Sequence, residues 1–447
     1  MSRADLLASR VPRYTSYPTA PQFQPRIGAE TYERWLRQLA QGSPLSIYVH
    51  IPFCDTLCWF CGCHTRVVNG YSPVASYLEL VRSELAAVAE ITGRDHSITH
   101  LHFGGGSPTI LEPRDFIAVV AQIRETYSFA GSAEFAVEID PRGLSDAKIG
   151  ALAKAGVNRA SVGVQDVDPK VQRAINRIQP FETTRSAIER LRAAGICNLN
   201  VDIMYGLPHQ TVRHVKETVD AMVSLRPNRL AVFGYAHVPH MKRHMMLIDQ
   251  KDLPTTAERL AQFDEAQSAL IAAGYVPVGL DHFALPDDPM AIAARSGKLR
   301  RNFQGYTTDS ADTLIGIGAS AIGGFRQGYV QNQTAVPSYR ERIRSGKLAT
   351  ARGIAFSRED TIRHAVIERL MCRLEVDLSE VAETFGLVAG HFADELVELE
   401  HLSREHLVEI DGWKIVVPGS ERAAVRVVCA VFDTYLDASA ARHALAV

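Results

Sequence analysis

Six short runs rich in β-branched residues alternate with amphipathic stretches along the first half of this 447-residue chain, and this alternation constrains the fold most. The runs lie at residues 45–52, 98–106, 133–141, 159–165, 198–208 and 228–239. Strands that alternate with helices indicate βαβ units and a parallel sheet. Right-handed crossovers curl such units around one axis. The pattern therefore predicts an α/β fold, a partial (β/α)6 barrel that with an extension covers residues 41–350.

The pattern changes after residue 355. Helix-like stretches at 358–374, 389–403 and 421–436 surround two strand-like runs within 406–417. Asp411-Gly412 between these runs predicts a hairpin. We therefore expect a mainly helical, winged-helix-like C-terminal domain over residues 355–447, which either caps the barrel or takes part in recognition. Residues 1–40 show little periodicity, are rich in Tyr, Pro and Arg, and are predicted to form an N-terminal arm.

The composition is that of a soluble globular protein, with 46% apolar and 22% charged residues. The formal charge of −2 lacks the basic excess of nucleic-acid-binding proteins, so we expect no nucleic-acid partner. No apolar run approaches the roughly 20 residues that a membrane helix needs. Residues 1–18 also lack the apolar core of a signal peptide. We therefore expect a cytoplasmic protein without membrane association, in which thiols stay reduced.

Four of the seven cysteines lie within ten residues, directly after the first predicted strand. Cys54, Cys58 and Cys61 form a CxxxCxxC pattern on a loop at the barrel rim. Reduced thiols in this arrangement favour a metal site or catalysis over disulfides. Thiolates hold iron–sulfur clusters, and three ligands leave one iron of a four-iron cluster open for a substrate or cofactor. A structural zinc ion held by these three cysteines and Cys63 or His64 is the alternative.

The cysteines outside this triplet have other interpretations. Cys63 is a spare ligand, a catalytic thiol or a loop residue beside the cluster, and three other cysteines already account for the iron site. Cys197, Cys372 and Cys429 are isolated in apolar contexts and are predicted to be buried and inert. They supply no second cysteine pair, which a structural zinc site typically uses.

The sequence around the cysteines resembles the radical S-adenosylmethionine (SAM) enzymes. In that family, CxxxCxxC after the first barrel strand holds a [4Fe–4S] cluster whose open iron binds the amino and carboxylate groups of SAM. The segment "HFGGGSPT" (102–109) follows the second predicted strand and matches the glycine motif of the family. Glycines allow a close approach of backbone and ligand because no Cβ intervenes. The resemblance implies that the backbone of Gly105 and Gly106 holds the methionine ammonium of the cofactor.

Single polar residues lie at or after the later predicted strands, where barrels of this kind collect function. They are Glu138, Gln165, Arg177 and Asp202. Carboxylates and an amide suit a positively charged sulfonium and a ribose, and a planar guanidinium suits an α-carboxylate. Each residue alone is also explained as a cap or a salt-bridge partner. Together with the cysteine loop they indicate a binding site.

Segments along nearly the whole chain resemble the family of oxygen-independent coproporphyrinogen III oxidases. They include "PRYTSYPTAPQF" (12–23), "YVHIPFCDTLCWFCGC" (48–63), "GVQDVDPKVQRAINR" (163–177), "DIMYGLP" (202–208), "FGYAHVP" (233–239), "DHFALPDD" (281–288), "RNFQGYTT" (301–308) and "FDTYL" (432–436). The resemblance implies oxidative decarboxylation of two propionates of coproporphyrinogen III to vinyl groups, which gives protoporphyrinogen IX in haem synthesis. It also implies two SAM molecules, an electron-donating protein such as flavodoxin or ferredoxin, and a monomer.

The resemblance assigns roles residue by residue. It implies that the cluster is held by Cys54, Cys58 and Cys61. The first SAM would contact Tyr48, Gly105, Gly106, Glu138, Gln165, Arg177 and Asp202. The second SAM would be lined by Ala236, Gln304 and Ile322, and Cys63 corresponds to an additional cysteine of the family with a catalytic role. The arm segment 13–19 would reach the mouth of the active site, and a strap across the outside of the barrel is the alternative.

The chain departs from the family pattern at a few positions. His64 stands where Asn often follows the fourth cysteine, and Ser107 replaces the usual Thr. Residues 240–250 match poorly, so no substrate contacts are carried over there. A substrate with four carboxylates calls for basic residues, and the candidates by charge alone, each better explained as solvated surface charge, are Lys242, Arg243, Arg300 and Arg301.

The alternative function is that of the related haem chaperones, which share the fold and the cluster cysteines but deliver haem. They typically lack three features: the Cys-Gly-Cys extension, the "RYTSYPT" arm and the "FQGYTT" segment. This chain contains all three. The sequence therefore favours the oxidase over the chaperone.

Overall fold

Parallel strands form the frame of the molecule. The computed structural model describes residues 3–388, 390–436 and 446. Six parallel strands lie side by side in chain order: β1 (Pro44–Ile51), β4 (Ser97–Gly105), β5 (Ser128–Ile139), β6 (Arg159–Gln165), β7 (Asn198–Tyr205) and β8 (Arg229–Gly234). Each predicted run overlaps one of these strands, so the predicted α/β fold is confirmed. Residues 1–2 of the predicted arm, and residues 389, 437–445 and 447 of the predicted C-terminal domain, lie outside the described residues.

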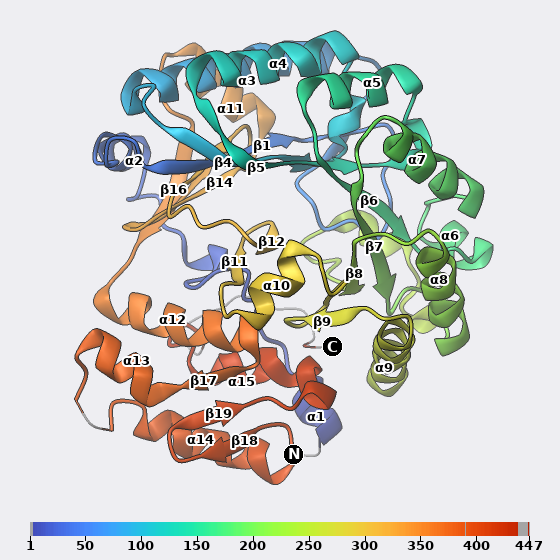
Figure 1. Cartoon of the computed structure of the whole chain (residues 1–447), viewed down its shortest axis with the longest axis vertical. Helices are drawn as coiled ribbons and strands as arrows, with labels where there is room; N and C mark the ends of the chain where they lie inside the picture. Colours follow the sequence, from blue (N-terminus) through green and yellow to red (C-terminus); the bar gives the residue numbers. More distant parts are fainter. Residues whose placement is uncertain (1–2, 389, 437–445, 447) are drawn as a thin grey trace.

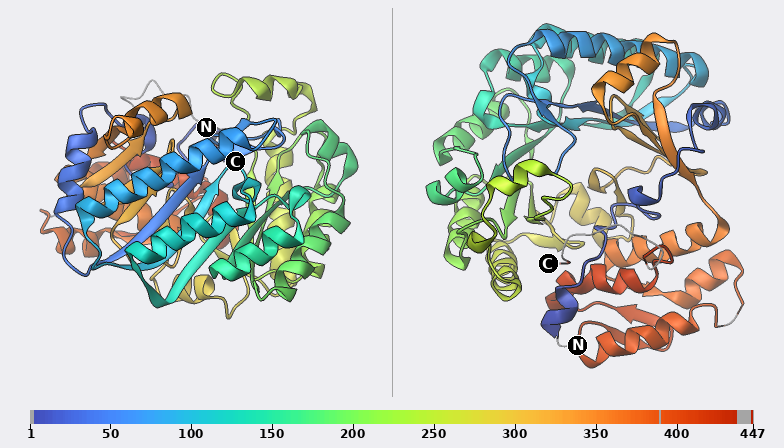
Figure 2. Two further views of the ribbon diagram at one scale, coloured as in Figure 1. Left: turned by 90° about the horizontal axis from the view of Figure 1, so that it is seen from above. Right: turned by 180° about the vertical axis from the view of Figure 1, so that it is seen from behind.

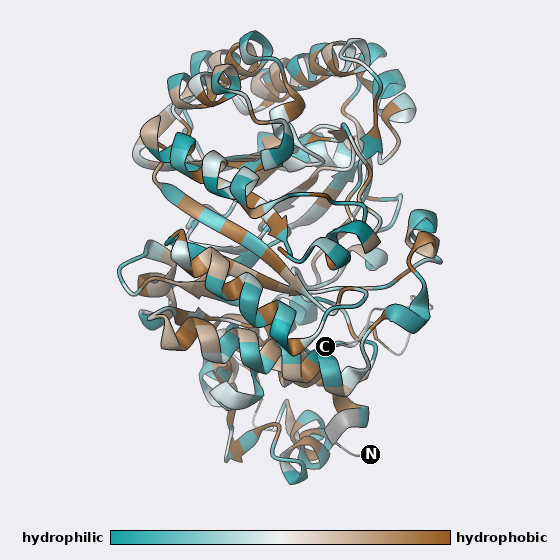
Figure 3. Cartoon of the chain, turned by 90° about the vertical axis from the view of Figure 1, so that its right-hand side faces the viewer, coloured by the Kyte–Doolittle hydropathy of each residue, from teal (hydrophilic) through white to brown (hydrophobic). Residues whose placement is uncertain are grey.

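Helices cover the outer face of the six strands (Figure 1, Figure 2). They are α3 (Ser72–Thr92), α4 (Pro113–Thr126), α5 (Asp146–Ala155), α6 (Pro169–Ala174), α7 (Phe181–Ala193), α8 (Val212–Ser224) and α9 (Thr256–Ala272). Figure 3 shows both hydrophilic and hydrophobic residues on the helices, as expected for amphipathic helices that cover a sheet. Among the described helices, none combines the length and the apolar character needed to cross a membrane.

The sheet continues past both edges of the six strands. Next to β1 lies the parallel strand β13 (Leu314–Ile317), followed by the antiparallel strands β14 (Ile322–Phe325), β15 (Gly328–Asn332) and β16 (Thr350–Ala355). Next to β8 lies β10 (His282–Ala284), which is antiparallel to it, and β9 (Val276–Val278) pairs antiparallel with β10 at the edge of the sheet. The same part of the chain also forms α10 (Pro289–Arg295), the hairpin of β11 (Arg300–Asn302) and β12 (Gly305–Thr307), and α11 (Val336–Arg344). The described sheet therefore has twelve strands, twice the number predicted from sequence.

The C-terminal part packs below the barrel in Figure 1. It contains α12 (Arg358–Arg373), β17 (Glu375–Asp377), α13 (Leu378–Phe385), α14 (Ala393–Arg404), β18 (Glu409–Asp411), β19 (Lys414–Val416) and α15 (Val425–Val431). The predicted hairpin is confirmed, since Asp411 pairs with Lys414 and Gly412 adopts a φ of 59° that favours glycine. The predicted last helix over 421–436 is too long, because a 3-10 turn occupies residues 419–424 and α15 ends at Val431.

The N-terminal arm runs between the barrel and the C-terminal part (Figure 2). It contains α1 (Arg3–Leu7) and α2 (Ala29–Arg37), and the second helix was missed in the sequence. Buried Tyr32, Trp35 and Leu36 hold α2 against the core. Further along the arm, the Tyr14 hydroxyl donates to Asp433 Oδ2 at 3.0 Å, which ties the arm to the C-terminal part. Tertiary packing rather than local periodicity therefore orders this segment.

A buried carboxyl links α3 to the extension of the sheet. Glu84 accepts hydrogen bonds from the Gly318 amide at 2.7 Å, Asn332 Nδ2 at 2.6 Å and the Tyr339 hydroxyl at 2.6 Å. Burial nevertheless raises the pKa of Glu84 to about 7, because desolvation outweighs these donors. The folded protein therefore retains a proton that an unfolded glutamate releases near pH 4.5.

This difference predicts a pH-dependent stability. Between pH 4.5 and 7 the folded state binds the Glu84 proton more tightly, so this contribution to the free energy of unfolding falls by about 3 kcal/mol as the pH rises. The Glu84→Gln variant lacks this titration. Chemical denaturation at pH 4.5, 6 and 8 should show the wild-type stability decreasing relative to that of the variant. Exposed Glu79→Gln on the same helix is the matched control, and a difference independent of pH would refute the assignment.

Candidate active site

The cysteine loop begins at the C-terminal end of β1. A short parallel pair, β2 (Phe53–Cys54) and β3 (Arg66–Val67), closes its base. Cys54 Sγ lies 3.1 Å from Thr65 Oγ1. Cys58 Sγ accepts hydrogen bonds at 3.5 Å from Arg142 Nη2 and from Arg177 Nη1. Two guanidinium groups therefore lie beside a sulfur that would carry negative charge as an iron ligand.

Cys61 and Cys63 lie at the other end of the loop. A hydrogen bond from the Cys63 thiol lowers the pKa of Cys61 to about 7, although burial opposes this change. Burial raises the pKa of Cys54 to about 12, and metal binding displaces thiol protons in either case. Lys242 Nζ donates to the Cys63 carbonyl, and His244 Nε2 lies 2.8 Å from the Cys61 carbonyl oxygen. The poorly matching segment 240–250 thus supports the cysteine loop.

The glycine loop after β4 packs directly against the cysteine loop. A Cβ at Gly106 would lie 2.5 Å from the Phe53 carbonyl oxygen and 2.5 Å from Thr65 Oγ1. At Gly105, whose φ is +117°, a Cβ would lie 2.6 Å from the His50 ring. Such distances are too short for any side chain. The glycines therefore allow close contact with β1 and with the base of the cysteine loop, a reason that the sequence interpretation did not include.

Glu138 and Tyr48 lie beside the glycine loop. Glu138 Oε2 accepts a hydrogen bond from the Gly105 amide at 3.0 Å, and its Oε1 lies 3.3 Å from His102 Nε2. Burial raises the pKa of Glu138, but these hydrogen bonds and the His102 ring outweigh it and hold the pKa below its ordinary value. The Tyr48 hydroxyl lies 3.0 Å from His50 Nδ1, and its ring contacts His102. The structure therefore brings together three residues predicted to contact SAM.

Gln165 and Arg177 lie at the ends of neighbouring elements. Gln165 ends β6 with a φ of +75°, which is uncommon for a residue other than glycine. The register of β6 and β7 shifts between Gly163 and Gln165, an irregularity of the kind found next to active sites. Arg177 Nη2 donates to the Gly163 carbonyl at 2.7 Å, and Nη1 donates to Asp140 Oδ2 at 3.2 Å. Arg177 Nε is buried without a hydrogen-bond partner among the described residues.

Asp202 lies in β7, on the face of the sheet that also carries Ser161. It accepts hydrogen bonds from Ser161 Oγ at 3.1 Å and Asn200 Nδ2 at 2.8 Å. Burial raises its pKa to about 6, and the negative charge of Glu138 adds to this shift. Ser161 pairs with Glu138 across β5 and β6 and also donates to Asp202, so the two carboxyl groups lie on the same face of the sheet. The structure thus places Glu138 and Asp202, two of the polar residues predicted to contact SAM, on one face of the sheet.

A second group of residues lines a cavity. We call it the arginine cavity, because its lining includes Arg13, Arg259, Arg301 and Arg426. Ala236 and Gln304, predicted to line the second SAM, both contribute to it. Ile322 begins β14 and is not among the described residues that line this cavity. The arm contributes Arg13 and Thr15, so it reaches the site and is not only a strap across the outside of the barrel.

The four basic candidates have different surroundings. Arg301 lines the arginine cavity, so its interpretation as solvated surface charge is wrong. Arg300 forms a surface ion pair with Asp312 at 3.4 Å, and Arg243 is exposed. Sequence reasoning missed three further cavity arginines: Arg13, Arg259 and Arg426. The signal for the last was available, since "VRVVCAV" places one arginine inside an otherwise apolar helix.

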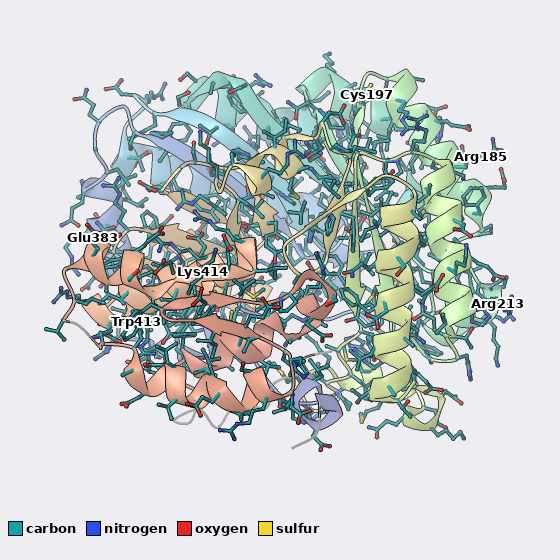
Figure 4. All side chains as sticks on the ribbon, turned by 60° about the horizontal axis from the view of Figure 1, so that its bottom comes forward. Arg185, Cys197, Arg213, Glu383, Trp413 and Lys414 are labelled. Atoms are coloured by element: carbon teal, nitrogen blue, oxygen red, sulfur yellow. The ribbon has the colours of Figure 1, made fainter. Side chains whose placement is uncertain are left out.

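The isolated cysteines divide into two kinds. Cys372 and Cys429 are buried, as predicted. Cys197 is exposed, and Figure 4 shows it at the outer edge of the molecule, so its prediction as a buried thiol is wrong. It lies in the turn between α7 and β7, where the neighbouring apolar residues turn inward and the cysteine does not.

The donor set of the cysteine loop fits an iron–sulfur cluster. Three thiols of the CxxxCxxC pattern lie on one loop, and guanidinium groups adjoin Cys58. Among the described residues, no three His, Cys, Asp or Glu side chains converge on a position for a single metal ion. A four-iron cluster spreads its thiolate ligands more widely than one ion does. The chemistry of these residues is therefore suited to a cluster with an open iron.

Comparison with known proteins decides the family. The sequence model of the Radical SAM superfamily matches residues 48–222. The chain is 48% identical over 449 residues to the oxygen-independent coproporphyrinogen III oxidase of Bradyrhizobium diazoefficiens, with all of both chains covered. The chain belongs to the oxygen-independent coproporphyrinogen III oxidase family. The family member of Escherichia coli is 38% identical, and the alignment covers 95% of this chain and 93% of that protein.

The fold of this oxygen-independent coproporphyrinogen III oxidase family member also has a solved counterpart. A coproporphyrinogen III oxidase from Escherichia coli, described as a radical SAM enzyme, superimposes with a TM-score of 0.90 and 37% sequence identity. The match covers 96% of this chain and 100% of the other. Membership in the radical SAM superfamily implies a [4Fe–4S] cluster and SAM as cofactors.

Proposed function

We propose that this enzyme converts coproporphyrinogen III to protoporphyrinogen IX without oxygen. Each of two propionates would lose carbon dioxide, one hydrogen atom to a 5′-deoxyadenosyl radical and one electron to an electron acceptor, which leaves a vinyl group. The observation that carries this proposal is the cysteine loop at the strand ends, adjoined by the polar side chains of Glu138, Arg177 and Asp202 and by the arginine cavity. An enzyme for a reaction of this kind needs both a radical-generating centre and a site for carboxylates.

The cofactor-binding residues are proposed from the family resemblance, and their positions in the fold support the proposal. Cys54, Cys58 and Cys61 would hold the cluster. When bound, the cluster and SAM supply a 5′-deoxyadenosyl radical that removes the hydrogen atom. The residues proposed to contact the first SAM are Tyr48, Gly105, Gly106, Glu138, Gln165, Arg177 and Asp202. The free Nε of Arg177 suits the α-carboxylate, and the negative charge of Glu138 suits the sulfonium.

A second SAM molecule is part of the proposal. Ala236 and Gln304 line the arginine cavity, which supports a second binding position next to the first. Ile322 belongs to the proposed set through the family resemblance alone. The stoichiometry is testable by equilibrium dialysis of the reconstituted enzyme with radiolabelled SAM, where two molecules per chain are expected.

Cys63 is proposed to be a catalytic thiol that does not ligate iron. Its side chain is exposed at the loop end, close enough to Arg13 for their charges to interact. We expect Cys63→Ser to retain the full iron content and to lower turnover on the order of tenfold to a hundredfold, because a serine hydroxyl is a much weaker acid than a thiol and transfers its proton less readily. Iron analysis and turnover measurements check this together. Loss of iron from the variant would place Cys63 among the ligands instead.

The electron donor and the monomeric state are proposed from the family resemblance. A flavodoxin or ferredoxin would supply electrons to the cluster, and the enzyme would act as a cytoplasmic monomer. Anaerobic reconstitution with iron and sulfide, followed by incubation with coproporphyrinogen III, SAM and a reductant, tests the activity. Formation of protoporphyrinogen IX supports the proposal. Stable transfer of haem without any porphyrinogen conversion would instead indicate a haem chaperone.

A further inference from the structure

The arginine cavity concentrates positive charge from four distant parts of the chain. Arg13 comes from the arm, Arg259 from α9, Arg301 from β11 and Arg426 from α15. Among the described residues that line the cavity, Asp281 supplies the one carboxylate. A tertiary arrangement that gathers four guanidinium groups around one acidic group is suited to an anionic ligand.

Backbone carbonyls hold two of these arginines in place. Arg259 Nη2 donates to the Tyr235 carbonyl at 2.8 Å, and Arg426 Nη2 donates to the Val11 carbonyl at 2.6 Å. Burial lowers the pKa of Arg259 and lowers that of Arg426 to about 10. These carbonyl contacts fix the orientation of both guanidinium groups. Both arginines therefore form a fixed part of the cavity wall.

The other two arginines remain available to a ligand. The Arg13 side chain is exposed to solvent, and its Nη2 donates to the Gly234 carbonyl at 3.0 Å. Arg301 Nη1 is buried and has no hydrogen-bond partner among the described residues. Its Nε donates to the Tyr14 carbonyl at 3.1 Å, and its guanidinium stacks on Tyr306 at 4.2 Å from the ring centre. A fixed guanidinium with an unused buried donor is prepared for a carboxylate oxygen.

The cavity adjoins the reaction centre. Arg13 and Cys63 interact electrostatically, as do His282 of the cavity wall and Asp202 of the proposed SAM site. A carboxylate bound between Arg13 and Arg301 would therefore lie beside the space where the hydrogen atom is removed. Two ligands of the proposed reaction carry carboxylates, namely the propionates of the substrate and the methionine group of a second SAM.

We propose that Arg13 and Arg301 bind a carboxylate of a reaction ligand and that the substrate propionate is the expected source. This assignment rests on the proposed function and makes both arginines determinants of specificity for a polycarboxylate. The C-terminal part, through Arg426, completes the same charged wall. It is therefore part of the binding site as well as a packing element.

The test uses anaerobically reconstituted enzyme with Arg13→Gln, Arg301→Gln and both changes together. Coproporphyrin III, the unreactive oxidised form of the substrate, is the probe in fluorescence titrations. Each single variant should raise its Kd about tenfold, and the double variant about a hundredfold, because each removes a charged hydrogen bond. Arg301→Lys should recover part of the loss, since it restores charge but not the planar fork. The matched control is Arg213→Gln on α8, whose side chain is 70% exposed at the periphery of the molecule (Figure 4).

Iron content and SAM stoichiometry are measured on the same samples. Weaker porphyrin binding with unchanged iron and SAM supports the substrate propionate as the ligand. If a variant binds one SAM molecule fewer but binds porphyrin with unchanged affinity, the two arginines still bind a carboxylate, and that carboxylate belongs to SAM. Unchanged binding of both ligands overturns the inference. If Arg301→Gln fails to fold, the Arg13→Gln variant alone still tests the inference. Wild-type enzyme that neither binds coproporphyrin III nor converts coproporphyrinogen III would overturn the proposed function instead.

Discussion

We expect Cys58→Ala protein, purified and reconstituted without oxygen, to lack the iron–sulfur chromophore and to cleave no SAM. Cys58 is the buried member of the CxxxCxxC set, and its sulfur accepts hydrogen bonds from Arg142 and Arg177. Alanine removes the ligand and leaves two guanidinium groups facing an empty position. Two remaining thiolates would not retain a four-iron cluster. Absorbance, iron analysis and 5′-deoxyadenosine release measure the loss.

The chain offers a matched control for this experiment. Cys197 is exposed in a turn outside the site, so Cys197→Ala should keep full iron content and activity. A brown, active Cys58→Ala protein would contradict the ligand assignment. Loss of iron in both variants would indicate that general handling of the protein, rather than a specific ligand, causes the loss.

The second large effect is expected from Gly106→Ala. A Cβ at this position would lie 2.5 Å from the Phe53 carbonyl oxygen, which is backbone and cannot rotate away. The base of the cysteine loop would have to move, at a cost of about 2 kcal/mol in the free energy of unfolding. Because Cys54 follows Phe53 directly, we expect cluster content to fall to background and activity to fall with it.

Thermal unfolding and iron analysis on the same preparation separate the two parts of this prediction. Gly131→Ala in β5 is the control, since a Cβ there meets no atom within 4 Å. It should leave stability and cluster content nearly unchanged. A Gly106→Ala protein with normal iron content would show that the two loops do not depend on close packing.

The strands of the barrel were predictable because they are long, β-branched and followed by amphipathic helices. The outer strands were not, because β14 reads Ile-Gly-Gly-Phe and two glycines in four residues indicate a turn locally. Its place in the sheet depends on pairing with β13 and β15, which no local pattern encodes. The helix α2 was missed for a related reason, since it is ordered by packing of Trp35 and its neighbours.

The site was predictable where chemistry follows spacing in the sequence. The cysteine loop and the polar residues after successive parallel strands must meet at one edge of the sheet. Arg301 was misjudged because only its strand register separates it from the surface residue Arg300. Arg13 and Arg426 were missed because they meet only through tertiary packing of the arm and the C-terminal part.

The residues that line the arginine cavity are far apart in the sequence, and this affects the order in which the protein assembles during its own synthesis. The cysteine loop and the barrel strands that hold its neighbours are all in place by residue 234, whereas Arg426 follows almost two hundred residues later. A growing chain on the ribosome therefore presents the cysteine loop before the arginine cavity is complete. Cluster assembly in this interval would precede the docking of the C-terminal part, which completes the cavity through Arg426.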